Sequence, residues 1–515
     1  MQGAARRALV WADAGMNRLY GWRHNPIYHS GALATALLLV LIVTGIYLLI
    51  FYRIGSPYAS MARIDAQVWA GRWIRTLHRY AADAALLAAA VHALRMFAQN
   101  KSWGPRVLAW VSGLFLVFFF FVCGWTGYVL VWDTQALVLA RAGARLLDVL
   151  PLFSEPLGRT FVGERPLPDA FFFINLFLHA ALPIGVGLLL WMHVARVARP
   201  ALLPPRALTR GVTGLLLAAS VLWPVGLAPE AELFRLPAVA PYDFFYAFWL
   251  PAAAAVPVGA VWAAFAATVL GLLLVPRLTR PRAAVPAPSV VDERACTGCE
   301  QCYHDCPYEA ISMVPRSDQR TTLVARVDPA LCVSCGICAG SCAPMVVGPP
   351  GRSGRAQLEG VRARLAERRP GPRDVVLIGC TRAAAREVDE AAPSLRGAVI
   401  RHPVSCVGSL HTAVIEQYLR AGAAGVLVVS CPERDCWNRE GAKWARQRMA
   451  GEREAELKER VDRRRVHLVY AAEAEGAALR AELDAFRRRL AVLGLASAAD
   501  DVDLRALCDR AEAAG

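Results

Sequence analysis

Residues 78–92 read HRYAADAALLAAAVH, and this pattern sets the architecture expected for the first half of the chain. Two histidines, His78 and His92, bracket a run of small apolar residues that carries one aspartate. A side chain that titrates near neutral pH is costly in an apolar helix. The same separation of fourteen residues recurs at His179 and His193, inside another apolar segment. We therefore expect both pairs to serve one purpose.

Hydrophobic residues make up 56% of the 515 positions of the chain. Long uncharged segments are concentrated in its first half. Crossing a bilayer takes about 20 residues. Segments of sufficient length lie at residues 30–52, 107–132, 170–195, 211–229 and 244–276. Residues 74–98, which hold the first histidine pair, form a further candidate despite four charged side chains. A buried soluble helix would explain any one segment, but the whole series favours an all-α transmembrane bundle of six spans within residues 1–275.

The net charge of +15, from 57 basic and 42 acidic residues, has two explanations. Nucleic-acid binding is one of them, but membrane proteins also retain Lys and Arg in their cytoplasmic loops. Basic residues gather before the first span, in alternate loops and after the sixth span: Arg6, Arg7, Arg18, Arg23, Arg95, Lys101, Arg106, Arg196, Arg199, Arg206, Arg210, Arg277, Arg280 and Arg282. We expect a multi-pass protein of the cytoplasmic membrane with both termini in the cytoplasm, no signal peptide and no nucleic-acid partner.

The histidine spacing predicts two metal sites stacked across the membrane. Fourteen residues make just under four helical turns, so the histidines of a pair share one face and lie about 21 Å apart. If spans alternate in direction, His78 lies level with His179 near the outer surface, and His92 lies level with His193 near the inner one. A hydrogen-bonded histidine or a proton path would explain a single residue. Two equal pairs favour two haems, because haem iron takes two axial ligands and imidazole is common among them.

Glycines in the neighbouring spans repeat the same period. Gly31 and Gly45 lie fourteen residues apart in the first long span, and Gly113 and Gly127 lie fourteen apart in the third. Glycine lets a bulky group approach a helix backbone closely. Ordinary helix packing is the alternative, but the shared period favours haem, with Gly31 and Gly113 at the inner level and the other two at the outer level.

Residues 15–275 resemble cytochrome b of the bc-type respiratory and photosynthetic complexes. The resemblance rests on the glycine pairs and on RTLHRY, VHALR, GYVLVWDTQA and FLHAALPIGVGLLLWMHVAR. It implies two b haems in the first four helices, a quinone pocket near each haem, and Arg75 and Arg95 near haem propionates. From the residues alone, both arginines are anchors at the membrane ends.

The stretch before the sixth span, APYDFFYAF, departs from that family. Cytochrome b has Pro-Glu-Trp-Tyr here, at its outer quinol pocket, and the glutamate that would take the quinol proton is missing. Asp243, beside Tyr242, is the candidate replacement, since a carboxylate within hydrogen-bond reach of the quinol hydroxyl could accept that proton. A helix cap is the alternative role for Asp243. The departure puts quinol oxidation at an outer site in question.

Two cysteine runs lie in residues 292–346, after a Pro- and Arg-rich linker at 276–291. They read CTGCEQCYHDCP and CVSCGICAGSC, with the same two-two-three spacing. On a cytoplasmic segment such density favours metal over disulfides, and zinc is the alternative to iron–sulfur clusters. The spacing resembles that of bacterial two-cluster ferredoxins, in which the fourth cysteine of each run ligates the other cluster. We assign one [4Fe–4S] cluster to Cys296, Cys299, Cys302 and Cys342, and the other to Cys332, Cys335, Cys338 and Cys306.

A second linker is expected at residues 347–371, with a short helix in its middle. Residues 372–496 then alternate four short β-rich runs, DVVLIG, AVIRHPV, GVLVVS and VHLVY, with helical stretches, the first of which is REVDEAA. This alternation predicts a parallel sheet covered by helices; residues 497–515 are a tail. Cys380 and Cys431 end the first and third strands, Cys406 closely follows the second, and Cys436 lies five residues beyond Cys431. Since parallel strands present their carboxyl ends at one edge, we expect the four thiolates to meet and to hold Zn²⁺ or a [2Fe–2S] cluster.

HPVSCVGSLHTAVIEQYLRAG, GAAGVLVVSCPERDCWNREGAKWARQRM and RVHLVYAAEAEG resemble the delta subunit of methyl-viologen-reducing hydrogenase. That resemblance implies a [2Fe–2S] cluster and electron transfer between a hydrogenase or dehydrogenase and heterodisulfide reductase. The family usually has a cysteine pair near its start, where this chain supplies only Cys380.

The order of these centres predicts a subunit that passes electrons between the quinone pool, through two b haems, and a cytoplasmic iron–sulfur or flavin subunit. The protein would act as a homodimer or within a larger complex. One alternative is the quinol-oxidising cytochrome b of a bc-type complex. Another is a haem-bearing anchor that does not turn over quinone.

Overall fold

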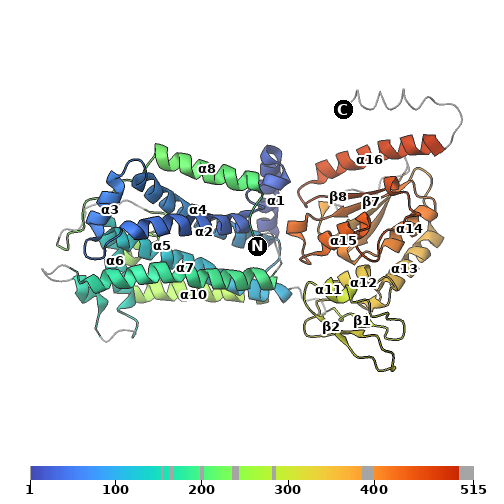
Figure 1. Ribbon diagram of the computed structural model, residues 1–515, viewed down its shortest axis with the longest axis horizontal. Coiled ribbons are helices and arrows are strands. Elements are labelled where there is room, and N and C mark those ends of the chain that lie inside the picture. Colours follow the sequence, from blue (N-terminus) through green and yellow to red (C-terminus); the bar gives the residue numbers. More distant parts are fainter. Residues whose placement is uncertain are drawn as a thin grey trace. The chain divides into compact units, whose positions relative to one another are not determined.

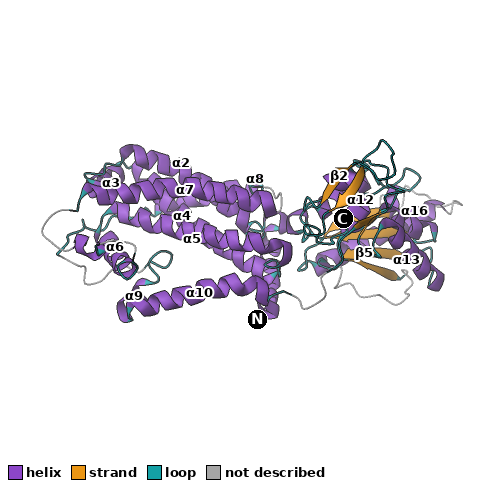
Figure 2. Ribbon diagram, turned by 90° about the horizontal axis from the view of Figure 1, so that it is seen from below, coloured by secondary structure: helices purple, strands orange, loops and turns teal. Residues whose placement is uncertain are grey.

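A computed structural model describes residues 2–151, 155–161, 167–197, 202–234, 243–280, 286–384 and 398–497. Its contacts divide the chain into two compact units, one of residues 1–197 with 201–281 and one of residues 198–200 with 282–515. The first unit is helical, and every β-strand of the described chain lies in the second (Figures 1 and 2).

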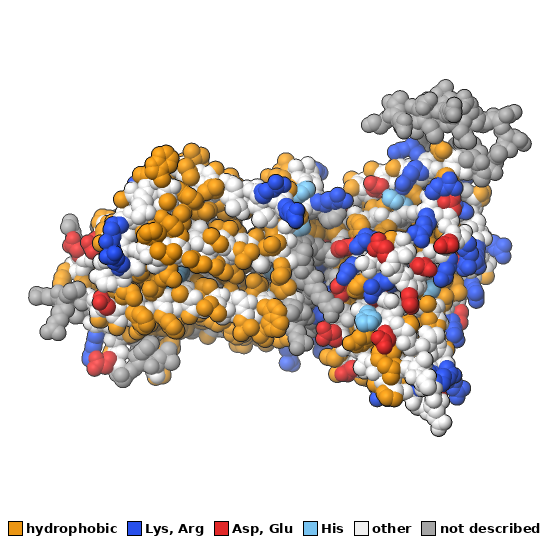
Figure 3. Space-filling view, in the orientation of Figure 1, with side chains coloured by type: hydrophobic (Ala, Val, Ile, Leu, Met, Phe, Trp, Pro, Cys, Tyr) orange, Lys and Arg blue, Asp and Glu red, His pale blue; other side chains and the backbone are white. Residues whose placement is uncertain are grey.

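Four long helices form the bundle of the first unit, in which α2 packs on α4 and α5 packs on α7 (Figure 1). Together with α10 they are the helices long and apolar enough to cross a membrane. Their bounds are Ser30–Phe51 for α2, Gly71–Ala98 for α4, Val107–Val131 for α5, Asp169–Val197 for α7 and Val258–Leu278 for α10. Large apolar side chains face outward over this unit, among them Val43 with 69% and Ile184 with 78% of its surface exposed (Figure 3). A surface of this kind is stable in lipid and would aggregate in water, so this is a multi-pass membrane protein.

Shorter helices complete the unit: α1 (Gln2–Tyr20), α3 (Pro57–Ala66), α6 (Thr134–Leu147), α8 (Arg206–Leu222) and α9 (Leu250–Ala255). Helix α8 covers only part of the span expected at residues 211–229, because the helix ends at Leu222 and Trp223 caps it. With 17 residues it lies at the lower limit of the length that crosses a bilayer. Five helices in the described chain therefore meet the criterion, where six spans were expected.

The second unit begins with a small ferredoxin-type domain of two short antiparallel ribbons. Strand β1 pairs with β4, and β2 pairs with β3. The bounds are Val290–Val291 for β1, Gln301–His304 for α11, Ile311–Val314 for β2, Val324–Val327 for β3, Ile337–Ser341 for α12 and Val347–Gly348 for β4. Each cysteine run continues into one of the two short helices, so that Cys302 and Cys338 lie in the apolar core of the domain beside Ile311 and Ala325.

A parallel sheet with the order β6-β5-β7-β8 forms the C-terminal domain (Figure 2). The strands are β5 (Val375–Cys380), β6 (Val399–Val404), β7 (Gly425–Ser430) and β8 (Val466–Tyr470). The helices are α13 (Gly354–Glu367), α14 (Thr412–Arg420), α15 (Gly441–Ala450) and α16 (Gly476–Ser497). Strands β5 and β7 are buried along their whole length, which explains their unbroken apolar sequence. All four expected strands form; the helix expected at REVDEAA lies outside the described residues.

Helix α13 falls in the segment expected to be a linker, residues 347–371. The side chain of Ser353 caps it by accepting a hydrogen bond of 3.3 Å from the backbone N–H of Ala356. Val361 and Leu365 on this helix belong to the same hydrophobic core as the sheet. The segment is thus part of the C-terminal domain rather than a free connection.

Candidate redox centres

The histidine pairs lie on α4 and α7. The rings of His78 and His179 have centroids 6.2 Å apart, so the two helices bring these side chains together at the level expected to be outer. His92 and His193 lie about four turns further along each helix, where their rings face Gly31 and Gly113. The geometry therefore sets the four side chains in the two pairs that the spacing predicts.

Each of the four glycines with the shared period faces one histidine ring. A Cβ added to Gly31 would lie 2.8 Å from Nδ1 of His92, closer than such atoms approach in proteins. Helices α2 and α5 therefore leave room for the rings that α4 and α7 carry. The contacts join Gly31 to His92, Gly45 to His78, Gly113 to His193 and Gly127 to His179.

Hydroxyl groups beside the glycines bind the histidines, a feature that the sequence analysis missed. Oγ of Thr44 lies 2.8 Å from Nδ1 of His78, and its own O–H donates to the carbonyl of Val40 at 2.7 Å. Oγ of Ser112 lies 2.8 Å from Nδ1 of His193. The signal was present, since Ser or Thr precedes every one of the four glycines.

These contacts fit haem as the bound group. An oxygen that accepts from Nδ1–H fixes the imidazole tautomer that has Nε2 free to bind iron. His179 follows the same rule, since its Nδ1 lies 2.9 Å from the carbonyl oxygen of Cys123 and 3.3 Å from Oγ of Thr126. Neutral, oriented imidazoles opposite glycines make a suitable cradle for a flat, bulky cofactor.

The two arginines expected near haem propionates are both paired with carboxylates. Arg75 donates to Asp65 at 2.7 Å. The buried Arg95 donates two hydrogen bonds to Asp13, of 2.9 and 2.8 Å, and its guanidinium lies 4.2 Å from the centre of the Tyr28 ring. Both bonds come from Nη1 of Arg95, which therefore bridges the two oxygens of the Asp13 carboxylate. In the structure both arginines therefore bind carboxylates of the protein, in addition to lying near the ends of a membrane-spanning helix.

Asp243 lies in a cluster of charged groups on the same side as His78. Arg79 forms ion pairs with both Asp243 and Asp83. The hydroxyl of Tyr128 donates to Asp243 at 2.6 Å and accepts from Arg79 at 2.6 Å. The other oxygen of Asp243 accepts backbone N–H bonds from the following turn, as a helix cap would. Asp243 is therefore a fully engaged acceptor; Tyr242, its expected companion, lies outside the described residues.

Two cavities in the ferredoxin-type domain gather the eight cysteines in two groups of four. The first is lined by Cys296, Cys299, Cys302 and Cys342. The second is lined by Cys306, Cys332, Cys335 and Cys338. The fourth cysteine of each run thus joins three from the other run, which is the grouping assigned from the sequence. Thiolates spaced around a cavity in this way fit a multi-iron cluster.

The chemistry of these thiols also fits iron–sulfur clusters. Burial raises the pKa of the Cys338 thiol to about 12, and burial also raises the pKa of Cys302. Such thiols lose their protons only when a bound cation replaces them. Backbone N–H groups of Ala310 and Val346 donate to Sγ of Cys306 and Cys342 at 3.3 and 3.4 Å, and bonds of this kind adjust cluster potentials.

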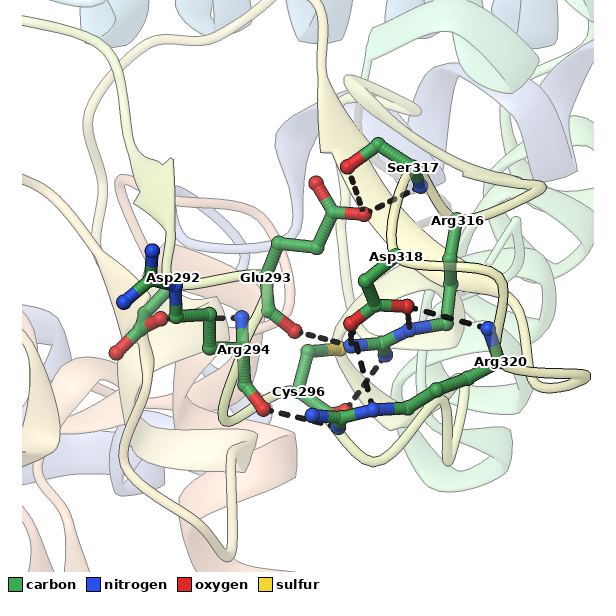
Figure 4. Close-up of polar contacts among 8 residues, drawn as sticks. All are labelled: Asp292, Glu293, Arg294, Cys296, Arg316, Ser317, Asp318 and Arg320. Carbon is green, nitrogen blue, oxygen red and sulfur yellow. Dashed lines mark hydrogen bonds and ion pairs between the residues drawn. The ribbon is translucent and has the colours of Figure 1, made fainter.

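A buried arginine holds the loop that carries the first cysteine (Figure 4). The side chain of Arg316 has 0% exposure and pairs with Asp318 at 2.7 Å. Its remaining N–H groups donate to the backbone carbonyls of Cys296 at 2.9 Å and Glu293 at 2.5 Å. The hydrogen bond from Arg316 keeps the pKa of Asp318 well below its usual value. The connection between β2 and β3 is thereby clamped to the chain at Cys296.

The four C-terminal cysteines meet at the carboxyl edge of the parallel sheet. Cys380 is the last residue of β5, Cys431 directly follows β7, and Cys406 lies two residues beyond β6. All are buried, and hydrogen bonds from Cys406 and Cys431 hold the pKa of the Cys436 thiol well below its usual value. The N-terminal end of α15 adds a backbone N–H bond to Cys436. The same hydrogen bonds raise the pKa of the Cys406 and Cys431 thiols well above its usual value, so the four side chains form one hydrogen-bonded group.

Three regions of the chain match known families. Residues 20–200 match the model described as Cytochrome b/b6/petB, residues 295–345 match a 4Fe-4S dicluster domain, and residues 375–494 match the delta subunit of methyl-viologen-reducing hydrogenase. The menaquinol:cytochrome c reductase cytochrome b subunit of Bacillus subtilis (strain 168) is 25% identical over 200 residues, or 34% of this chain and 89% of the relative. The subunit of the same name from Geobacillus thermodenitrificans is 26% identical over 167 residues, or 31% and 75%.

These matches confirm the composite character expected from the sequence motifs. They follow one another along the chain in the expected order and do not overlap. The chain is a fusion of a cytochrome b region, a 4Fe–4S dicluster domain and a domain of the hydrogenase delta-subunit type.

Proposed function

We propose that this membrane electron-transfer subunit connects the quinone pool, through two b haems, with a cytoplasmic iron–sulfur or flavin subunit. The observation that carries the proposal is the pair of histidine sites, each opposite its glycines, in one chain with three cysteine sites. When bound, haem iron and iron–sulfur clusters each accept and release one electron at a time. The protein supplies the ligands, their orientation and a low-dielectric path across the membrane.

The proposed outer haem is held by His78 and His179, and the inner haem by His92 and His193. The ferredoxin-type domain holds two [4Fe–4S] clusters, in the cysteine groups given above. Cys380, Cys406, Cys431 and Cys436 hold a [2Fe–2S] cluster. The alternative for this last site is zinc, which the same four thiolates would bind.

We place both termini and all iron–sulfur centres in the cytoplasm, with α8 as a short sixth span. In support, the segment after α8 reaches the level of His78, where the backbone N–H of Val225 donates to Thr76 at 3.1 Å. Helix α10 then returns, because the indole of Trp110, near the start of α5, donates to the carbonyl of Leu272 at 2.8 Å. The chain would therefore leave the membrane at the level of His92.

The quinone site is proposed at the outer level, with Asp243 as the candidate proton acceptor and Tyr242 as a further residue of the site. Because Arg79 already binds Asp243, a quinol hydroxyl would have to displace part of that ion pair. This disfavours rapid outer-site oxidation of the kind a bc-type complex needs. A quinol-oxidising cytochrome b is the second candidate, because the names of the two relatives describe that role.

The test uses the purified full chain. Reduced-minus-oxidised spectra are expected to give two b haems per chain, and His78→Ala and His179→Ala are each expected to remove the same one and spare the other. Survival of both haems in either variant contradicts the pairing. A reduced menaquinone analogue is expected to reduce haem, and a quinone-site inhibitor to block this. Haem that stays oxidised at every pH would instead support an anchor without quinone turnover.

A further inference from the structure

The ferredoxin-type and C-terminal domains are joined by a buried ionic network. The side chain of Asp305 is 0% exposed and that of Arg448 is 1% exposed, at 4.0 Å from each other. Arg448 donates to Oγ of Ser341 at 2.8 Å and to the carbonyl of Gly408 at 2.6 Å. Ser341 donates to Asp305 at 2.5 Å, and Nε of Arg453 donates to the same carboxylate at 2.8 Å. Buried charges are retained only with such complete pairing, so this is a fixed junction.

The junction contacts the ferredoxin-type domain beside the two cysteines that are each grouped with the other run. Asp305 directly precedes Cys306, and Ser341 directly precedes Cys342. These are the fourth cysteines of the two runs, and each lines the cavity of the other run. Any movement at the junction would therefore displace a cysteine of each cluster site.

Three glycines line the path from the ferredoxin-type domain to the C-terminal cysteine site, and the contact between Gly340 and Gly408 joins the two domains through backbone. A Cβ added to Gly340 in α12 would lie 2.5 Å from the carbonyl oxygen of Gly408. One added to Gly408 would lie 2.4 Å from Cα of Gly441, and one added to Gly441 would lie 2.5 Å from Sγ of Cys406. The absence of side chains at these positions thus lets α12, which carries Cys338, approach the C-terminal cysteine site through backbone alone.

A second contact lies on the other side of Cys306. Arg439, three residues after Cys436, donates to the carbonyl of Pro307. Its guanidinium lies 4.4 Å from the centre of the Tyr308 ring. The loop that carries one C-terminal ligand therefore rests on the residues that follow a ligand of the second cavity.

We infer that this junction is an internal electron-exchange interface between the [4Fe–4S] cluster of the second cavity and the C-terminal [2Fe–2S] cluster. One electron leaves the reduced cluster and reduces the oxidised one, and no bond or proton is exchanged. Asp305 and Arg448 are positioning residues, and Gly340 sets the closeness of approach. The inference rests on the proposed function for the identity of the clusters.

The test compares Gly340→Ala with Gly360→Ala in the full chain. Gly360 is also a helical glycine, but a Cβ there meets nothing within 4 Å. The protein is mixed with substoichiometric dithionite, and the spin on each cluster is followed by freeze-quench EPR. Gly340→Ala is expected to slow equilibration between the two clusters at least tenfold and to weaken their spin–spin coupling, with unchanged iron content. Gly360→Ala is expected to behave as wild type.

Arg448→Lys is a second variant, because it keeps the charge but loses the forked contact with Ser341 and Gly408. It too is expected to slow exchange while the final distribution of electrons stays the same. Wild-type exchange rates in both variants, with intact clusters, overturn the inference and leave the proposed function standing. Zinc in place of the [2Fe–2S] cluster in the wild-type protein overturns both.

Discussion

Thr44→Val is expected to shift the midpoint potential of one b haem and not the other. Thr44 is placed to accept a hydrogen bond from Nδ1–H of His78 across 2.8 Å, while its hydroxyl donates to the backbone of its own helix. A bond donated by the imidazole makes that ligand more electron-rich and favours ferric iron. Valine has the same shape as threonine and removes only the acceptor, so the potential is expected to rise.

The size of the shift follows from the strength of one hydrogen bond. A typical intramolecular bond contributes about 0.5–1.5 kcal/mol net. For a one-electron couple, about 1.4 kcal/mol corresponds to 59 mV. Only part of the bond energy differs between ferric and ferrous haem, so we expect a rise of about 20 to 40 mV.

Redox titration of the purified chain, followed in the visible haem bands, measures this shift. Thr35→Val is the matched control, because Thr35 lies on the same helix and makes the same kind of bond to its own backbone, at 3.2 Å to Gly31. Ser112→Ala is expected to move the other haem through His193. If Thr44→Val and Ser112→Ala move the same haem, or if Thr35→Val produces an equal shift, the assignment of ligands is refuted.

Three further outcomes test other parts of the structure. Cys431→Ala is expected to abolish the [2Fe–2S] signal in low-temperature EPR and to leave the [4Fe–4S] signals; retention of all three would contradict the assignment. Asp243→Asn removes a half-buried partner of Arg79 and is expected to destabilise the membrane domain by about 1–3 kcal/mol, seen as a lower melting temperature in detergent. Burial and the charge of Arg364 lower the pKa of His402 to about 4, so the unfolded chain binds more protons than the folded one between pH 6.5 and 4. Stability should fall by about 1–2 kcal/mol from pH 7 to pH 5 in urea unfolding, and His402→Gln should remove that loss.

Features fixed by regular geometry could be predicted from the sequence. The pairing of His78 with His179 follows from the length of a helical turn. The meeting of Cys380 and Cys431 follows from the common edge of parallel strands. Neither depends on how individual side chains pack, which explains why spacing alone was sufficient.

Features that depend on tertiary contact could not be predicted in this way. Arg79 and Asp243 are 164 residues apart, and only the packing of the bundle brings them together. The shortness of α8 could not be predicted, because the apolar composition of residues 211–229 does not indicate where the helix ends. A short helix was expected within the linker at residues 347–371, but its packing on the sheet through Val361 and Leu365 was not, because that contact joins distant parts of the chain.

The pairing of β1 with β4 bears on how such a chain could have arisen. Val290 pairs with Gly348 and Val291 with Val347, so the first and last strands of the ferredoxin-type domain lie side by side. A domain whose two ends meet can be inserted between two others without distorting its own fold. Such an insertion keeps all eight cysteines that line the two cavities within one domain, whatever stands before and after it in the chain.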